Sequence, residues 1–126
     1  MTGPIRHIVM WRLSGDTPEA RAAARRKVKD AFEGLRGRIA GLTLLEVGLD
    51  VSGVDYACDV VLVTEFSSHA ALEAYATHPE HLRVRQELTD LRIARFQVDY
   101  LVEPPLDAEA DGTAAAHPAR ELLAGE

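Results

Sequence analysis

The stretch Leu72–His81, LEAYATHPEH, decides the fold because it predicts a helix that stops and then starts again. The residue before a proline avoids the helical region, so His78 marks a boundary inside this segment. Pro79 suits the first position of a helix, where its missing N–H costs no hydrogen bond. The same stretch brings together Tyr75 and His81, whose side chains are able to act in acid/base chemistry.

Around this stretch the sequence predicts four strands and a first, longer helix. Alternating apolar residues predict strands at residues 5–13, 42–49, 58–66 and 95–102. Thr17 and Pro18 predict the start of the first helix. The resulting order, β-α-β-β-α-β, predicts an α+β fold of the ferredoxin-like kind, with one four-stranded antiparallel sheet and helices on one face. The apolar stripe of the first helix consists of Ala24, Val28, Phe32, Leu35 and Ile39.

Both faces of the predicted strands are apolar near their centres. In the first strand, His7, Val9 and Trp11 share one face, and Ile8 and Met10 occupy the other. The helices can cover only one face, so we expect the second face to meet the sheet of a second copy and form a homodimer. The alternative is that the strands are simply well filled on both faces.

Composition limits the domain organisation and the partners. The chain has 126 residues, enough for one domain, which we expect at residues 1–103. The remaining residues, 104–126, are acidic and rich in alanine, and we expect a mobile tail there. The net charge of −6 argues against nucleic acid as a partner. The sequence shows neither a membrane-length apolar run nor a signal peptide, so we expect no membrane association and a cytoplasmic location.

Three side chains are candidates for chemistry. His81 lies beside the inward stripe of its helix, and Tyr75 and His7 are predicted to face the same core. Histidine moves protons near neutral pH, and a tyrosine hydroxyl stabilises an enolate, although inward residues of both types more often serve packing. His78 and His81 have a spacing known from metal ligands, but Pro79 separates them and no third ligand is evident. We therefore expect no metal site.

These features resemble the stress-responsive A/B barrel family, also called Dabb. The resemblance spans about residues 5–103 and rests on RHIVMWRL, IAGLTLLEVGLDVS, DVVLVTEFSSHAALEAYATHPEHLRV and FQVDY. It implies a dimeric α+β barrel in which two four-stranded sheets pack face to face.

In a plant polyketide cyclase of this family, a tyrosine and a histidine close a linear polyketide by an aldol step without a cofactor. The resemblance matches these residues to Tyr75 and His81, and a pocket histidine to His7. Val28 and Arg92 stand where that cyclase has aromatic residues, which implies a pocket of different size and polarity. The positions that match its pocket lining are Val9, Trp11, Val28, Phe32 and Leu62.

The resemblance leaves two functions open. The first is a small-molecule pocket protein with cofactor-free acid/base activity, such as cyclisation of a polyketide or formation of an aromatic product. There His81 is the general base, Tyr75 is the oxyanion donor, and His7 orients a small hydrophobic, phenolic or polyketide substrate. The second is a non-enzymatic, stress-associated homodimeric binding module. Oxidation of haem or small phenols is a weaker third alternative, which no residue of this sequence singles out.

Overall fold

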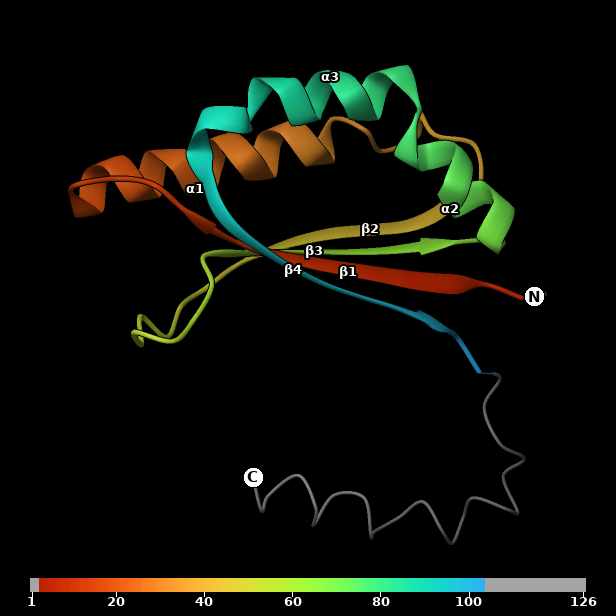
Figure 1. Cartoon of the computed structure of the whole chain (residues 1–126), viewed down its shortest axis with the longest axis horizontal. Coiled ribbons are helices and arrows are strands. Elements are labelled where there is room, and N and C mark those ends of the chain that lie inside the picture. The colour runs from red at the N-terminus through yellow and green to blue at the C-terminus, as the bar shows by residue number, and fades with distance from the viewer. Residues whose placement is uncertain (1–2, 104–126) are drawn as a thin grey trace, which may run out of the picture.

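The computed structural model describes residues 3–103, which form one four-stranded antiparallel sheet with helices on one face (Figure 1). Along the chain the elements are β1 (Ile5–Leu13), α1 (Pro18–Glu33), β2 (Leu42–Leu49), β3 (Val60–Phe66), α2 (His69–Ala76), α3 (Pro79–Glu87), a 3-10 turn η1 (Thr89–Leu91) and β4 (Arg92–Leu101). The strands lie side by side in the order β2-β3-β1-β4. The predicted ferredoxin-like arrangement is confirmed, and the predicted tail at residues 104–126 lies outside the described residues.

The starts of all three helices follow from local capping chemistry. The hydroxyls of Thr17 and Ser68 accept backbone N–H groups from the first turns of α1 and α2. His78 keeps an extended backbone before Pro79, and its Nδ1 accepts a hydrogen bond from the N–H of Glu80 (3.0 Å). The helix break that the sequence predicts is therefore the N-cap of α3.

Some element ends differ from the sequence prediction for tertiary reasons. The strand β3 begins at Val60 rather than at residue 58, because the N–H of Asp59 donates to the carbonyl of Trp11 and its carboxylate binds Arg25 (2.8 Å). The strand β4 begins at Arg92 rather than at residue 95, since it pairs with β1 directly after the 3-10 turn. The helix α1 ends at Glu33, although the next residues of its predicted stripe, Leu35 and Ile39, are still buried in the core.

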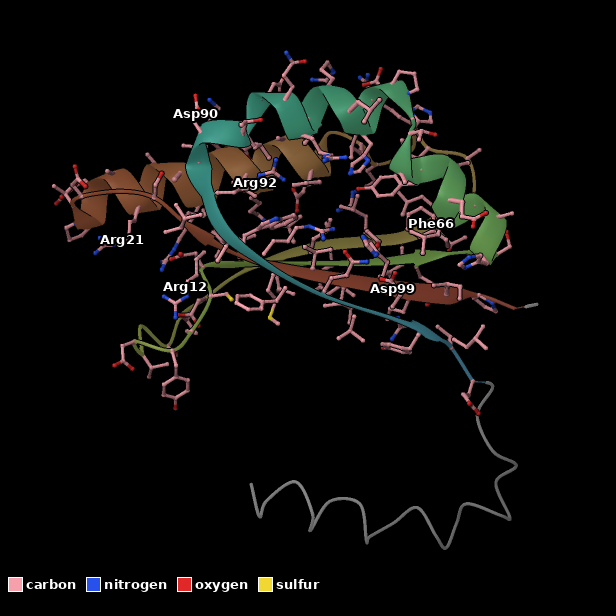
Figure 2. The ribbon with its side chains drawn as sticks, in the orientation of Figure 1. Arg12, Arg21, Phe66, Asp90, Arg92 and Asp99 are labelled. Atoms are coloured by element: carbon pink, nitrogen blue, oxygen red, sulfur yellow. The ribbon has the colours of Figure 1, made fainter. Side chains whose placement is uncertain are left out.

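The core lies between the helices and the face of the sheet that β1 and β3 dominate. Phe66 of β3 is fully buried, and Figure 2 shows it close to α2. Trp11 of β1 stacks on Phe32 of α1, with ring centroids 5.0 Å apart. Burying side chains of this size contributes about 1.5–3 kcal/mol each, so this aromatic layer fixes α1 against the sheet.

The opposite face of the sheet, which we term the open face, has no helix over it (Figure 1). Phe96 and Val98 of β4 pair with Met10 and Ile8 of β1 on this face and are 52% and 59% exposed. Within residues 3–103 no element covers these side chains. The apolar centre of the open face comes from three strands and consists of Ile8, Met10, Val61, Val63, Phe96 and Val98.

Candidate active site

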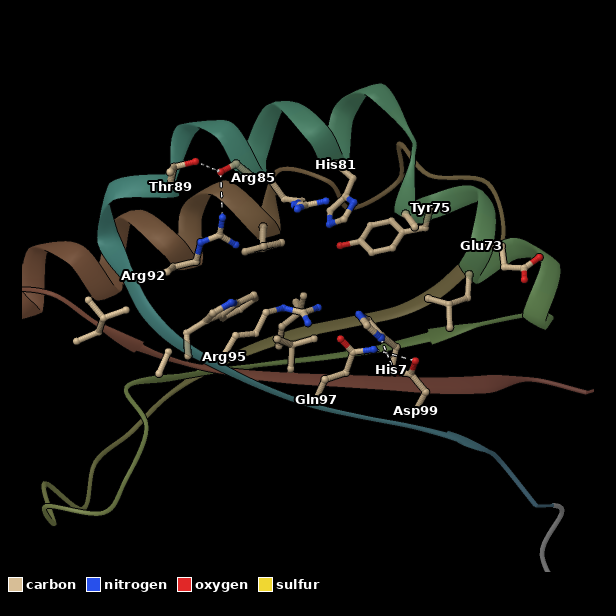
Figure 3. Close-up of a pocket in the computed structure, with 18 of the residues that line it drawn as sticks. His7, Glu73, Tyr75, His81, Arg85, Thr89, Arg92, Arg95, Gln97 and Asp99 are labelled. Carbon is tan, nitrogen blue, oxygen red and sulfur yellow. Dashed lines mark hydrogen bonds and ion pairs between the residues drawn. The ribbon is translucent and has the colours of Figure 1, made fainter.

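A cavity of about 710 Å³ lies between the sheet and the helices α2 and α3 (Figure 3). It exists because β4 is polar on its helix-facing side, where Arg95, Gln97 and Asp99 pair with Trp11, Val9 and His7 of β1. Because these side chains are polar, β4 offers α3 no apolar surface to pack against, and the space between them stays open. The volume falls within the range of about 300–1,000 Å³ that is typical of small-molecule sites.

Tyr75 and His81 meet on the helix side of the cavity, across the break between α2 and α3. Their rings stack with centroids 4.0 Å apart and an angle of 26° between their planes. Tyr75 is only 2% exposed, and Figure 3 shows its hydroxyl directed into the cavity. Because Pro79 restarts the helix, the last turn of α2 and the first turn of α3 present these two rings to the same space.

Burial shifts the pKa values of both rings. It raises the pKa of the Tyr75 phenol above its ordinary value, so the hydroxyl remains a hydrogen-bond donor. Burial is also the main reason that the pKa of His81 falls to about 4; the charge of Arg85 adds to this, while the carbonyls of Ala76 and Tyr75 oppose it. Neither carbonyl makes a well-formed bond to Nδ1 of His81, which is buried without a partner in the described part of the chain. The imidazole is therefore neutral at pH 7.

His7 faces these two rings from the sheet. It is 7% exposed, and its ring centroid lies 6.2 Å from that of Tyr75. Its Nδ1 lies 2.6 Å from Oδ1 of Asp99, while Gln97 donates to the other carboxylate oxygen (3.0 Å). A carboxylate only accepts, so Nδ1 carries a proton and donates it to Asp99, which leaves Nε2 directed away from the carboxylate. His7 and Asp99 thus form an oriented pair at the cavity wall.

The structure places the residues expected at the site in two groups. Those at the cavity include His7, Tyr75 and His81 together with Val9, Trp11, Phe32 and Leu62. Val28 is not among the lining residues, because it points from α1 into the core and is fully buried. His78, which caps α3, does not line the cavity either, and residues 3–103 contain no cluster of three or more metal-ligating side chains.

Sequence reasoning missed Asp99, Arg85 and Arg95, all of which line the cavity. The signal for Asp99 and Arg95 was the alternation of β4, where the apolar residues occupy the open face and leave these two for the other. The signal for Arg85 was its position four residues after His81, on the same side of α3.

Solved structures of the same fold come from several organisms. A dimeric protein of unknown function with a ferredoxin-like fold from Bacteroides fragilis is 31% identical (TM-score 0.71), over 80% of this chain and 98% of that one. A Dabb family protein from Mesorhizobium loti is 28% identical (TM-score 0.63), over 82% and 100% of the two chains. A hydroxynitrile lyase from Passiflora edulis shares the fold at 14% identity (TM-score 0.67), over 84% and 99%.

The sequence itself identifies the family. No curated protein sequence matches the chain. Residues 5–102, which include every strand and helix described above, match the family model Dabb, described as the stress responsive A/B barrel domain. No helix within residues 3–103 is long and apolar enough to cross a membrane. The chain belongs to the stress-responsive A/B barrel domain family.

Proposed function

We propose that this chain is a cofactor-free acid/base catalyst that forms or breaks a carbon–carbon bond beside a carbonyl group. The observation that carries the proposal is the stacked pair of Tyr75 and His81 at the wall of a 710 Å³ cavity, faced by His7 and Asp99. A protonated phenol and a neutral imidazole are the two states that this chemistry requires. One donates to an oxygen that gains charge, and the other accepts a proton from carbon.

Each of these groups has a task in the proposed reaction. His81 removes a proton from the carbon beside a carbonyl, and the C–H electrons form an enolate whose oxygen receives a hydrogen bond from Tyr75. The enolate carbon attacks a second carbonyl of the same molecule and forms the carbon–carbon bond. The proton held by His81 then returns to the new alkoxide oxygen, so no oxidant or reductant is needed. His7, fixed by Asp99, orients the substrate through Nε2.

The cavity walls support a flat and partly apolar substrate of the phenolic or polyketide kind. The indole of Trp11, backed by Phe32, forms one wall, and Val9 and Leu62 add apolar surface on the sheet. The likeness to a hydroxynitrile lyase concerns the fold alone, so the assignment depends on the residues of this cavity.

In this proposal the protein forms a homodimer, and the two copies associate through the open face. An exposed apolar sheet centre of this kind is typical of a surface that a partner covers. The Bacteroides fragilis relative, at 31% identity, is dimeric. A second copy is the simplest partner, because its open face carries the same apolar side chains.

The catalytic proposal is tested with linear poly-β-ketone acids. The wild-type protein should accelerate both the exchange of their methylene protons for deuterium, followed by NMR, and the formation of cyclised product. Tyr75→Phe and His81→Ala should each lower these rates by about 100-fold or more. Tyr56→Phe is the matched control, because Tyr56 is 82% exposed and does not line the cavity, and it should not change the rates.

Equal rates for the wild type and both cavity variants would contradict the assigned roles. Saturable binding of the ketone acids without exchange or product would instead favour the second function, a non-enzymatic binding module.

A further inference from the structure

We propose that the cavity is built to hold an anionic group, a carboxylate or a phosphate of its small-molecule ligand, on Arg85, Arg92 and Arg95. The inference rests on the proposed function, because it names the ligand class of the same cavity. It is carried by the position of the three guanidinium groups, by their lack of carboxylate partners and by the apolar wall beside them.

The three arginines reach the cavity from α3 and β4 (Figure 3). Arg92 is held in place, because its Nη2 donates to the carbonyl of Arg85 (3.0 Å), which also accepts the hydroxyl of Thr89 (3.0 Å). Its guanidinium carbon lies 5.8 Å from the ring centroid of Trp11. Arg95 lies opposite Trp11 in the β1–β4 register. These contacts place positive charge directly beside the aromatic wall.

None of the three arginines forms an ion pair with a carboxylate of residues 3–103. Arg83, on the outer side of the same helix, is by contrast held by Glu80 (2.9 Å) and Glu87 (2.8 Å). The chain has 20 acidic and 14 basic residues, so carboxylates are plentiful, yet none neutralises this group of arginines.

The two carboxylates that do line the cavity are already engaged. Asp99 accepts from His7 and Gln97. Glu73, at the exposed end of the cavity, lies 3.2 Å from Nε2 of His69. The positive charge of the arginines is therefore left for a ligand.

Three guanidinium groups around one cavity repel one another when no anion is bound. Burial is the main cause of a lowered pKa at Arg92, and the charges of Arg85 and Arg95 lower it further. Guanidinium groups bind carboxylate and phosphate oxygens in pairs, and such a bound anion turns the repulsion into attraction. The indole beneath Arg92 is placed to contact the apolar body of the same ligand.

The test uses the full chain and two anionic probes, benzoate and phenyl phosphate, with benzyl alcohol as their uncharged counterpart. Trp11 is the only tryptophan and lines the cavity, so quenching of its fluorescence reports binding at this site. At least one anion should bind about tenfold more tightly than benzyl alcohol, as charged hydrogen bonds require. The anion that binds more tightly identifies the group as carboxylate or phosphate.

Variants assign the effect to the cavity. Arg85→Gln and Arg95→Gln should each weaken anion binding by about tenfold or more, without lowering the melting temperature, because both side chains are exposed and unpaired in the described chain. Arg83→Gln removes the same charge from the outer side of α3 and should leave binding unchanged.

Three results would overturn the inference: equal binding of benzyl alcohol and the anions, no saturable binding of either anion, or equal weakening by Arg83→Gln. The assay needs no turnover, so such a failure leaves the roles of Tyr75 and His81 to their own test. Anion binding without proton exchange on the ketone acids would support the inference and contradict the proposed catalysis.

Discussion

His81 shows how one side chain takes its chemistry from its place in the fold. An exposed histidine titrates near pH 6.5, but at the junction of α2 and α3 burial lowers the pKa to about 4. The stacked ring of Tyr75 provides part of that burial, and burial also raises the pKa of its own phenol. Burial at this junction therefore lowers the pKa of the base and raises the pKa of the donor.

The lowered pKa of His81 makes the stability of the protein depend on pH. Between about pH 4 and pH 6.5 the unfolded chain binds more protons at this residue than the folded chain does. The free energy of unfolding should therefore fall as the pH falls through this window, with no contribution from His81 above it. His81→Gln lacks the titrating group, so its unfolding free energy should fall less steeply with pH. The two slopes should differ by an amount that corresponds to at most about one bound proton. Urea unfolding at pH 7 and pH 5 measures this pH dependence for the wild type and the variant. An equal loss of unfolding free energy in the two proteins would contradict the lowered pKa of His81.

Arg85 should control how strongly His81 holds a proton. Its charge opposes protonation of the ring, although less than burial does. Arg85→Gln should therefore raise the pKa of His81 above about 4 while leaving it below 6.5, as followed by NMR of the imidazole protons. Arg83→Gln removes an equal charge that Glu80 and Glu87 already neutralise, so it should leave the pKa of His81 unchanged. An unchanged midpoint in Arg85→Gln would show that the guanidinium does not act on the ring.

At the scale of elements, the close approach of the β2 entrance to α2 requires a glycine. Gly41 has φ +83°, and a Cβ there would lie 2.6 Å from the Cβ of Ala71, one turn before Tyr75. Gly37 has a similar φ, +81°, but open space around it. Gly37→Ala should cost about 1–2 kcal/mol of unfolding free energy, for the backbone alone. Gly41→Ala should cost a further 1–3 kcal/mol or so, because the added methyl pushes α2 away.

Chemical denaturation of both glycine variants measures this difference. Gly41→Ala should also lower the rate of methylene exchange, since α2 carries Tyr75, while Gly37→Ala should keep the wild-type rate. Equal destabilisation by the two substitutions would show that the contact with Ala71 does not matter.

Elements were predictable from sequence wherever a local signal fixes them. The proline break, the serine and threonine caps and the alternation of β1 and β2 act over a few residues, and the structure has those elements where the sequence predicts them. The ends of β3 and β4 depend on bonds to distant segments, as in the bond from Asp59 to Trp11. The same limit explains the missed part of the site, because His7 and Asp99 are 92 residues apart and meet only through the β1–β4 register.

At the scale of the whole molecule, the two sides of the sheet differ: within residues 3–103 the cavity side carries unpaired positive charge, and the other side has an apolar centre. The chain is acidic overall, yet the cavity above the sheet carries three arginines without carboxylate partners in the described residues. Below the sheet, the open face has an apolar centre with the paired Arg6 and Glu65 (2.6 Å) beside it. An apolar centre with polar residues around it is the usual anatomy of a protein interface. The proposed ligand therefore binds on the cavity side of the sheet, and the proposed second copy binds on the open face.

The open face should hold two copies of the chain together. The wild type should therefore show a mass near twice 13.8 kDa by light scattering at micromolar concentration. Val98→Asp should give a mass near 13.8 kDa, because a carboxylate at the centre of the interface loses its hydration without gaining a partner. The monomer fold should survive, since Val98 is 59% exposed in the single chain. Val51→Asp makes the same change at a loop residue that is 99% exposed and should remain dimeric. A monomeric wild type, or equal masses for the two variants, would remove the open face as the site of association.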